Sequence, residues 1–321
     1  MKRLIVVYNP RSSRYADVRV EVLERLSELK GYMVGKYEVE KIGIEGNVEK
    51  LAGLLKDGDT VLAAGGDATG VIAANAIMES GRDVVLAVLP YGNFNDLART
   101  LGTETLDDIV DQTHLFRTHS RPFGQAYGPQ KTGLGRLYPL EIVIDGKLWR
   151  YATCYVTMGM TAEAVKLYDS SKMRKKLKTG WGRKVGSYTA LTGWYFKHRH
   201  KKTFIPEFKL NGALQDKRIS DYAAVNGKSM ARVMKGGEDF CKPRVFRSEV
   251  DKLTSFWRLF KLMARSVLVR VPGSETSGDV LEFVDGGRVE VQAEGESRVF
   301  EGMKKIEIRK AEKCLKVIVS S

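Results

Sequence analysis

The chain has 321 residues, of which 43% are hydrophobic and 29% charged, and its formal net charge is +14. This length fits about two domains of roughly 100–200 residues each, and the composition is that of an ordinary soluble globular protein. Its three cysteines, Cys154, Cys241 and Cys314, are far apart and form no CxxC pair, which argues against disulfide staples and against a Cys-based metal site. No apolar stretch approaches the ~20 residues that span a bilayer, and the N-terminal apolar run is too short for a secretory signal. We therefore expect a cytoplasmic protein with no transmembrane segment and with a polyanionic partner.

The first 120 residues alternate between strand-like and helix-like segments. The expected strands are residues 3–8, 36–44, 60–64 and 83–90. The expected helices are residues 16–30, 47–56 with Asn47 as N-cap, 67–80, 95–101 and 106–111. Alternation with short connections predicts a parallel α/β sheet.

The pattern changes after about residue 120. Residues 139–158 predict a hairpin that turns at Asp145-Gly146. Further strand candidates are 203–227, 265–271, 280–284, 287–293, 298–301, 304–309 and 314–319, with a turn at Asp285-Gly286-Gly287. The predicted fold is an N-terminal α/β nucleotide-binding domain with a parallel sheet, residues 1–120, followed by an antiparallel β-sandwich domain, residues 121–321, with a basic insertion at 162–202. Whether the C-terminal tail, residues 303–321, packs back on the first domain stays open.

Three polar or glycine-rich loops follow expected strands of the first domain: 9–13, 65–69 and 90–96. In open α/β sheets, ligands bind beyond the carboxyl ends of the strands. Glycines let backbone N–H groups approach phosphate oxygens, and a following helix N-terminus adds a positive end. Asp67 can hold Mg²⁺ or accept a proton from an attacking hydroxyl. A strand-to-helix turn with an aspartate N-cap produces the same letters at 65–67, so that simpler reading stays open.

These loops resemble those of one family. YNPRSS (8–13), GGDAT (65–69) and PYGNFNDLART (90–100) followed by LG are similar to motifs of the diacylglycerol kinase catalytic domain and its bacterial lipid kinase relatives. Sphingosine and ceramide kinases share that fold, and NAD kinases and phosphofructokinases share the GGD loop but not the motif at 90–100. The resemblance is strongest over residues 1–102 and continues weakly to the end. It implies a lipid kinase that uses ATP and Mg²⁺ and a diacylglycerol-like acceptor.

The resemblance also implies roles for individual residues. The implied nucleotide-binding residues are Asn9, Ser12, Ser13, Gly65, Gly66, Asp67, Ala68, Thr69, Gly92, Asn93, Asn95 and Asp96. Among them, Asn95 and Asp96 would cap the next helix and order the cleft. Asp67 would organise the γ-phosphate through Mg²⁺ or act as the base. Glu296, in a turn that looks like the family's D-G-E, would be the general base for the lipid hydroxyl, although an exposed hairpin glutamate explains it equally well.

The sequence departs from the family pattern at three places. Ala68 replaces a glycine, and alanine costs roughly 1 kcal/mol or more if that backbone needs φ > 0. Asn93 replaces Thr or Ser. The family's metal motif D-D-G in the second domain should fall within 244–253, where this chain has only Glu249 and Asp251. Glu249 is therefore the metal candidate of the second domain, and Asp67 is that of the first. Two alternatives therefore stay open: a membrane- or polyanion-binding pseudokinase with a degenerate ATP site, and an NAD kinase-like small-molecule kinase.

Residues 172–202 contain eleven Lys or Arg and no Asp or Glu, interleaved with aromatic residues. Such a mixture suits an anionic membrane interface, and it also suits single-stranded nucleic acid. A core stripe of Val185, Tyr188, Leu191 and Tyr195 is compatible with the first use. We expect this segment to bring a peripheral protein to its lipid substrate at an anionic membrane surface, and we do not expect nucleic acid as the partner. The acceptor lipid and a homodimer stay open.

Overall fold

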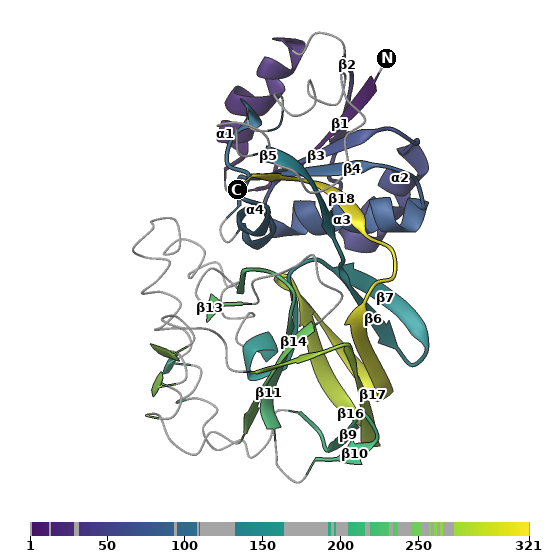
Figure 1. Ribbon diagram of the computed structural model, residues 1–321, viewed down its shortest axis with the longest axis vertical. Helices are drawn as coiled ribbons and strands as arrows, with labels where there is room; N and C mark the ends of the chain where they lie inside the picture. The colour runs from purple at the N-terminus through teal and green to yellow at the C-terminus, as the bar shows by residue number, and fades with distance from the viewer. Residues whose placement is uncertain are drawn as a thin grey trace. The chain divides into compact units, whose positions relative to one another are not determined.

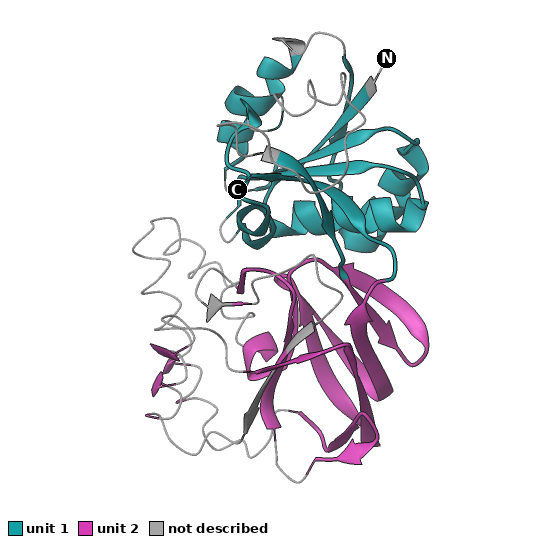
Figure 2. Cartoon of the chain, in the orientation of Figure 1, with its two compact units in different colours: residues 1–139, 312–321 teal, residues 140–311 magenta. Residues whose placement is uncertain are grey.

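The computed structural model describes residues 2–12, 14–28, 32–92, 95–107, 109, 132–163, 205–215, 219–230, 234–236, 245–251 and 273–320, with the shorter pieces 192–193, 196, 257, 260–261 and 264–265. The chain forms two compact units, residues 1–139 with 312–321 (unit 1) and residues 140–311 (unit 2) (Figure 2). The division expected near residue 120 falls among residues outside the described ranges.

Unit 1 is built on a six-stranded sheet in the order β2-β1-β3-β4-β18-β5 (Figure 1). The strands are β1 (Lys2–Tyr8), β2 (Tyr32–Glu38), β3 (Thr60–Gly65), β4 (Val85–Pro90), β5 (Thr132–Leu137) and β18 (Leu315–Ser320). All neighbours pair in parallel except β18 with β5. The predicted α/β class is confirmed, and the apolar runs of β1, β3 and β4 suit strands that are buried on both faces.

Helical segments connect these strands: α1 (Tyr15–Val18), η1 (Arg19–Leu23), η2 (Arg25–Glu28), α2 (Gly43–Leu54), α3 (Asp67–Ser80) and α4 (Asp96–Leu101). Leu4 and Val6 of β1 share a core with Val18 and Val22. Because side chains alternate along a strand, the residues between them face the other way, where α3 lies against the sheet and α2 packs on α3.

Two predicted boundaries in unit 1 are wrong. Strand β2 occupies Tyr32–Glu38 instead of 36–44, and α2 begins at Gly43 instead of after an Asn47 cap. Asn47 is buried inside α2. Its side chain accepts a hydrogen bond from the Glu40 N–H (2.8 Å) and donates to the carbonyls of Glu40 (3.1 Å) and Gly43 (2.5 Å). It therefore ties the strand-to-helix loop together instead of capping a helix.

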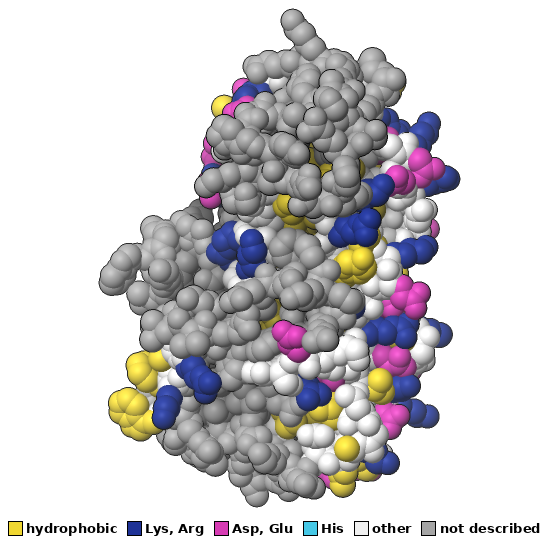
Figure 3. Space-filling model, in the orientation of Figure 1, with side chains coloured by type: hydrophobic (Ala, Val, Ile, Leu, Met, Phe, Trp, Pro, Cys, Tyr) yellow, Lys and Arg dark blue, Asp and Glu magenta, His cyan; other side chains and the backbone are white. Residues whose placement is uncertain are grey.

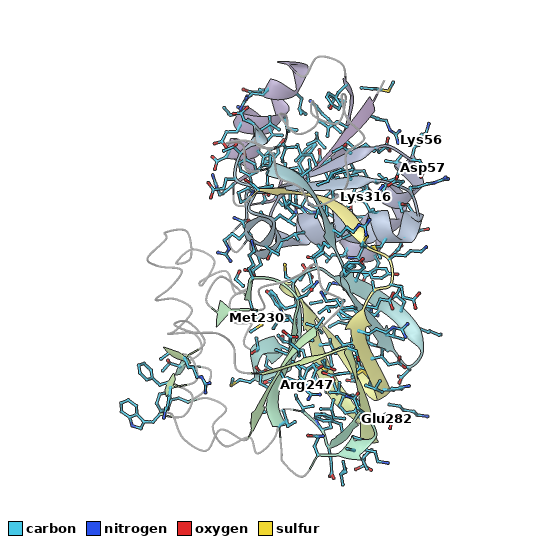
Figure 4. The ribbon with its side chains drawn as sticks, viewed as in Figure 1. Lys56, Asp57, Met230, Arg247, Glu282 and Lys316 are labelled. Carbon is cyan, nitrogen blue, oxygen red and sulfur yellow. The ribbon has the colours of Figure 1, made fainter. Side chains whose placement is uncertain are left out.

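The strand β18 returns to unit 1 after the whole of unit 2. It pairs in parallel with β4 and antiparallel with β5. Lys316 on β18 forms an ion pair with Asp83 at 2.6 Å (Figure 4 labels Lys316). Gly102 has φ +77, and a Cβ there would overlap the Ser320 carbonyl, so glycine is required where α4 ends against β18.

Unit 2 is an antiparallel sheet whose main path is β15-β14-β11-β8-β16-β17-β6-β7, as predicted for its class. Its strands are β6 (Leu140–Ile144), β7 (Lys147–Ala152), β8 (Tyr155–Gly159), β9 (Phe208–Leu210), β10 (Ala213–Leu214), β11 (Ile219–Val225), β14 (Val245–Asp251), β15 (Ser274–Thr276), β16 (Gly278–Ala293) and β17 (Glu296–Lys310), and a separate pair is β12 (Ser229–Met230) with β13 (Met234–Lys235). The predicted hairpin turn at Asp145-Gly146 is confirmed, with φ values of +48 and +80 that fit a primed turn.

The predicted turn at 285–287 is wrong, because β16 and β17 are continuous strands. The register between them shifts around Gly287, and Gly286 and Gly302 both have positive φ. This irregularity behaves as a β-bulge, which bends a strand without ending it. The first part of β16 can thus pair with β9 and its last part with β8. The strand expected at 265–271 lies outside the described residues except for Arg265, which is helical.

The buried Asp279 carboxylate joins three strands of unit 2. Arg247 of β14, labelled in Figure 4, contacts the Asp279 carboxylate of β16 at 2.9 Å. The same carboxylate accepts a hydrogen bond from the Tyr222 hydroxyl of β11 at 2.7 Å. A buried charge is tolerated only when it is paired and hydrogen-bonded, and these two partners meet that condition.

Candidate active site

The polar loops of unit 1 follow three neighbouring strands. β2 lies on one side of β1 and β3 on the other, so the order in which the chain adds strands reverses between β1 and β3. Ligands of open α/β sheets bind at such a switch point, beyond the carboxyl ends of the strands. The loops after β1, β3 and β4 contain most of the residues that the sequence singled out.

Asp67 is the first residue of α3 and links two of these loops. Its carboxylate accepts hydrogen bonds from the backbone N–H groups of Asn95 (3.0 Å) and Asp96 (2.7 Å), in the loop after β4. Gly66 is the N-cap of α3, and no side chain caps this helix. A partly exposed carboxylate therefore stands at the start of a 14-residue helix whose first N–H groups have no partner within the helix.

Two carboxylates lie close together in this loop pair. Asp96 is only 2% exposed and forms an ion pair with Arg99, one turn later in α4, at 2.5 Å. Burial, and after it the negative charge of Asp96, raises the pKa of Asp67 to about 7, although the two N–H bonds and the Arg99 charge act in the opposite direction. Near neutral pH the Asp67 carboxylate is thus divided between its protonated and its ionised form.

Asn95 orders the loop after β4 from within. It has φ +54, a left-handed conformation that asparagine tolerates better than most residues. Its side-chain oxygen accepts a hydrogen bond from the Gly92 N–H (2.7 Å), and its amide donates to the carbonyls of Pro90 (3.0 Å) and Gly92 (2.9 Å). The same residue thus shapes the loop with its side chain and holds Asp67 with its backbone.

Gly66 and Gly92 are where the two loops touch. A Cβ on Gly92 would overlap the Gly66 Cα and lie 2.8 Å from the Asn95 Oδ1, and a Cβ on Gly65 would lie 2.8 Å from the Cβ of Thr69. Close approach of the Gly66 backbone therefore requires glycine at position 92, and the Thr69 side chain requires glycine at position 65, whatever ligand the loops bind.

Ala68 does not carry the backbone strain that the sequence left open. It is the second residue of α3 and is not among the residues with positive φ. Thr69, one residue later, is buried in the first turn. An alanine in this chain therefore fits a position where the family has glycine.

The loop after β1 is held by its own side chains. The Asn9 Oδ1 accepts a hydrogen bond from the Arg11 N–H (3.0 Å), and the Ser12 N–H donates to the Asn9 carbonyl (3.0 Å). The Ser12 hydroxyl is buried and makes no hydrogen bond to any described residue. Arg14 donates to the Pro90 carbonyl at 3.2 Å and thus connects this loop to the one after β4. Ser13 and Asn93 lie outside the described residues.

The remaining candidates belong to unit 2. Glu296 is the first residue of β17 and is exposed. The buried carboxylate of this turn belongs to Glu294, which has φ +51 and accepts hydrogen bonds from the Thr153 hydroxyl and the Cys154 N–H. Glu249 lies in β14 opposite Tyr222, and its side chain is outside the described part of the structure. Over the described ranges, no three His, Cys, Asp or Glu side chains gather into a metal cluster.

Sequence reasoning missed three charged residues that shape these loops and turns. Arg99 could have been found, because it stands three residues after Asp96 on a predicted helix. Arg14 pairs locally with Asp17, but nothing local indicates its bond to Pro90 or the bonds of Glu294, because those partners are distant in the chain. Of the basic segment 172–202, only residues 192–193 and 196 are described. No described helix combines the length and the apolar character needed to cross a bilayer.

Comparison with known proteins bears on unit 1 most directly. Residues 3–125 match the family model of the diacylglycerol kinase catalytic domain. A diacylglycerol kinase of Bacillus subtilis is 31% identical over 155 residues, which cover 46% of this chain and 50% of that protein. One from Staphylococcus saprophyticus is 29% identical over 153 residues, with the same two shares. The chain thus spans about half the length of the curated relatives it matches.

A crystal structure of a diacylglycerol kinase from Bacillus anthracis is similar over nearly the whole chain. Its TM-score is 0.67 at 14% sequence identity, and the match covers 99% of this chain and 97% of that one. At this identity the likeness shows the two-domain fold alone. The sequence similarity is confined to the first part of the chain: residues 3–125 resemble the diacylglycerol kinase catalytic domain.

Proposed function

We propose that this protein is a lipid kinase that transfers the γ-phosphate of ATP, with Mg²⁺, to a hydroxyl of a diacylglycerol-like lipid. One observation carries the proposal: the Asp67 carboxylate stands at the uncapped start of α3, beside the switch point of the sheet, and is held there by the N–H groups of Asn95 and Asp96. The match of residues 3–125 to the diacylglycerol kinase catalytic domain and the names of the relatives support the same activity.

The residues of this site fit a phosphate chain. The first N–H groups of α3 are not capped by a side chain, and the helix macrodipole favours an anion there. Gly65 and Gly66 carry no side chain that would keep phosphate oxygens away from the backbone. The buried Ser12 hydroxyl in the neighbouring loop has a hydrogen bond left to donate. These features are what nucleotide phosphates require of a binding loop.

The donor set also fits Mg²⁺. Mg²⁺ is bound in kinases through one or two carboxylates together with phosphate oxygens. Asp67 would hold it, because each of its oxygens accepts one hydrogen bond from the described residues and keeps a further lone pair. When bound, the ion neutralises charge on the phosphates. A nearby cation also favours the ionised carboxylate, whose pKa burial otherwise raises to about 7.

The base for the lipid hydroxyl is Asp67 or Glu296 in this proposal. Glu296 is exposed on β17 and can meet a substrate, whereas Glu294 is buried in the turn. Ala68 supports a working enzyme over a pseudokinase, because the alanine is accommodated in helical geometry. We further propose that the protein works as a peripheral protein at the cytoplasmic face of a membrane.

The test is phosphorylation of a lipid panel with radiolabelled ATP. We expect labelled lipid from the wild type and none from Asp67→Asn, with activity kept in Asp107→Asn, which changes only an exposed ion pair with Arg25. Wild-type turnover in Asp67→Asn would refute the site. Vesicle binding without labelled lipid would favour the pseudokinase, and a labelled product that stays in the aqueous phase would favour an NAD kinase-like reaction.

A further inference from the structure

Three aromatic side chains are exposed among the described residues. They are Trp257 (73%), Phe260 (52%) and Phe196 (49%). Tryptophan is highly buried on average in folded proteins, so an indole with three quarters of its surface exposed is unusual. The rings of Trp257 and Phe260 pack edge to face, with centroids 6.0 Å apart and an interplanar angle of 85°. The two rings thus form one exposed apolar pair.

Basic side chains accompany these aromatics. Lys261 and Arg265 lie four and eight residues after Trp257, and each is helical and exposed, as Trp257 is. Residues 252–274 contain five Lys or Arg and no Asp or Glu. Phe196 lies in the segment 172–202, so all three exposed aromatics come from two segments with sixteen Lys or Arg and no acidic residue. Figure 3 shows hydrophobic and basic side chains side by side in the lower left of the view.

The combination of aromatic and basic side chains on this surface suits an anionic bilayer better than another protein. Tryptophan and phenylalanine rings suit the headgroup region of a bilayer, and Lys or Arg next to anionic lipid contributes about 1 kcal/mol each. A second copy of the chain is disfavoured, because a two-fold contact would bring Lys261 and Arg265 of both copies together. Docking of another protein on the apolar side chains alone would not explain why residues 252–274 contain no Asp or Glu.

We propose that Trp257, Phe260, Lys261 and Arg265, the aromatic–basic surface, dock this protein on an anionic bilayer. The aromatic rings enter the headgroup region, and the two cations contact lipid phosphates. The proposal deepens the proposed function, on which it rests for the presence of a lipid substrate. It assigns membrane contact to a surface separate in sequence from 172–202.

Fluorescence of single tryptophans tests the surface directly. The chain has four tryptophans. Trp149→Phe/Trp181→Phe/Trp194→Phe leaves Trp257 alone, and the matched control Trp181→Phe/Trp194→Phe/Trp257→Phe leaves Trp149, which packs against the core of unit 2. With phosphatidylcholine vesicles that contain phosphatidylglycerol and brominated acyl chains, Trp257 should be quenched and Trp149 should not. Vesicle binding with no quenching of Trp257 would overturn the proposal.

Sedimentation with the same vesicles measures the affinity. Lys261→Ala/Arg265→Ala should weaken binding about 30-fold at low salt, from two cations at about 1 kcal/mol each. Trp257→Ala/Phe260→Ala should weaken it at least about ten-fold, because the buried apolar area is lost. Leu148→Ala removes a comparably exposed side chain, 47% exposed, from β7 and should leave binding unchanged. Equal binding by all three variants would refute the surface.

The remaining outcomes are also decisive. Quenching of Trp257 by pure phosphatidylcholine alone would contradict the electrostatic part of the proposal. A dimer in sedimentation equilibrium that the Trp257→Ala/Phe260→Ala variant abolishes would assign the surface to a second copy, and binding of a single-stranded oligonucleotide with quenching of Trp257 would assign it to nucleic acid. None of these measurements uses ATP, so a failure of the kinase assay leaves this test unaffected.

Discussion

Replacing Gly92 with alanine tests the contact between the loops after β3 and β4. Gly92 does not have positive φ, so alanine is compatible with its backbone conformation and the effect isolates steric contact. The new Cβ would overlap the Gly66 Cα and lie 2.8 Å from the Asn95 Oδ1. Carbon atoms prefer separations of about 3.5–4.0 Å, so the two loops must move apart by roughly 1 Å.

The magnitude follows from two terms. Overpacking of a well-packed site costs about 1–3 kcal/mol, and loss of the 2.7 Å hydrogen bond from Gly92 to Asn95 adds about 1 kcal/mol. We expect the free energy of unfolding of unit 1 to fall by about 2–4 kcal/mol. For a unit of this size, that lowers Tm by about 5–15 °C. The movement also takes the N–H groups of Asn95 and Asp96 away from Asp67, so lipid phosphorylation should fall with it.

Gly53→Ala is the matched control. Gly53 lies on the exposed side of α2, and a Cβ there meets nothing within 4 Å. Alanine should raise the free energy of unfolding by about 0.5–1 kcal/mol, because it restricts the unfolded chain. Thermal and urea unfolding of both variants provide the measurement. A Gly92→Ala protein within about 0.5 kcal/mol of wild type would show that the two loops are not in backbone contact.

Three further substitutions test other parts of the structure. Asn95→Ala removes three hydrogen bonds inside its loop, so urea unfolding should show a loss of about 2–4 kcal/mol, and wild-type stability would contradict the described loop. The folded protein keeps a proton on Asp67 up to about pH 7, whereas the unfolded chain releases it near pH 3.9, so the wild-type free energy of unfolding should fall as the pH rises between these values. Asp67→Asn should reduce that fall by more than about 1 kcal/mol between about pH 5 and about pH 8, and an unchanged slope would refute the raised pKa. Tyr222→Phe withdraws a hydrogen bond from the buried Asp279 carboxylate and should cost about 1–3 kcal/mol in thermal unfolding, whereas an unchanged Tm would show that Asp279 does not need this donor.

Strong, uniform patterns made much of unit 1 predictable. Strands β1, β3 and β4 each contain an uninterrupted apolar run, and each leads into a polar or glycine-rich loop. Strand β2 was misplaced because YMVGKYE has no clear alternation, and its extent is decided by pairing with β1, residue by residue. The glycines at 286 and 287 predict a turn as readily as a bulge, and only the pairing of β16 with β8 and β9 shows that the strand continues.

The site was predictable in its residues and not in its contacts. The letters GGD and ND identified Asp67, Asn95 and Asp96 as one group. Their hydrogen bonds join residues 28 and 29 positions apart, and no local pattern reports such a pairing. The turn before β17 shows the same limit, because the sequence gives no reason why Glu294 is buried and Glu296 is exposed. Backbone conformation decides it: Glu294 has positive φ and turns its carboxylate toward Thr153.

The position of β18 has a consequence for how the chain folds. The ion pair between Lys316 and Asp83 joins residues 233 positions apart. During synthesis, β4 leaves the ribosome long before its neighbouring strand β18 has been made, because all of unit 2 is synthesised between them. We expect unit 2, which is contiguous in sequence, to be able to fold first, while the sheet of unit 1 closes only after residues 315–320 emerge. An exposed strand edge can pair with other chains. We therefore expect the nascent chain to be most prone to aggregation before β18 has paired with β4.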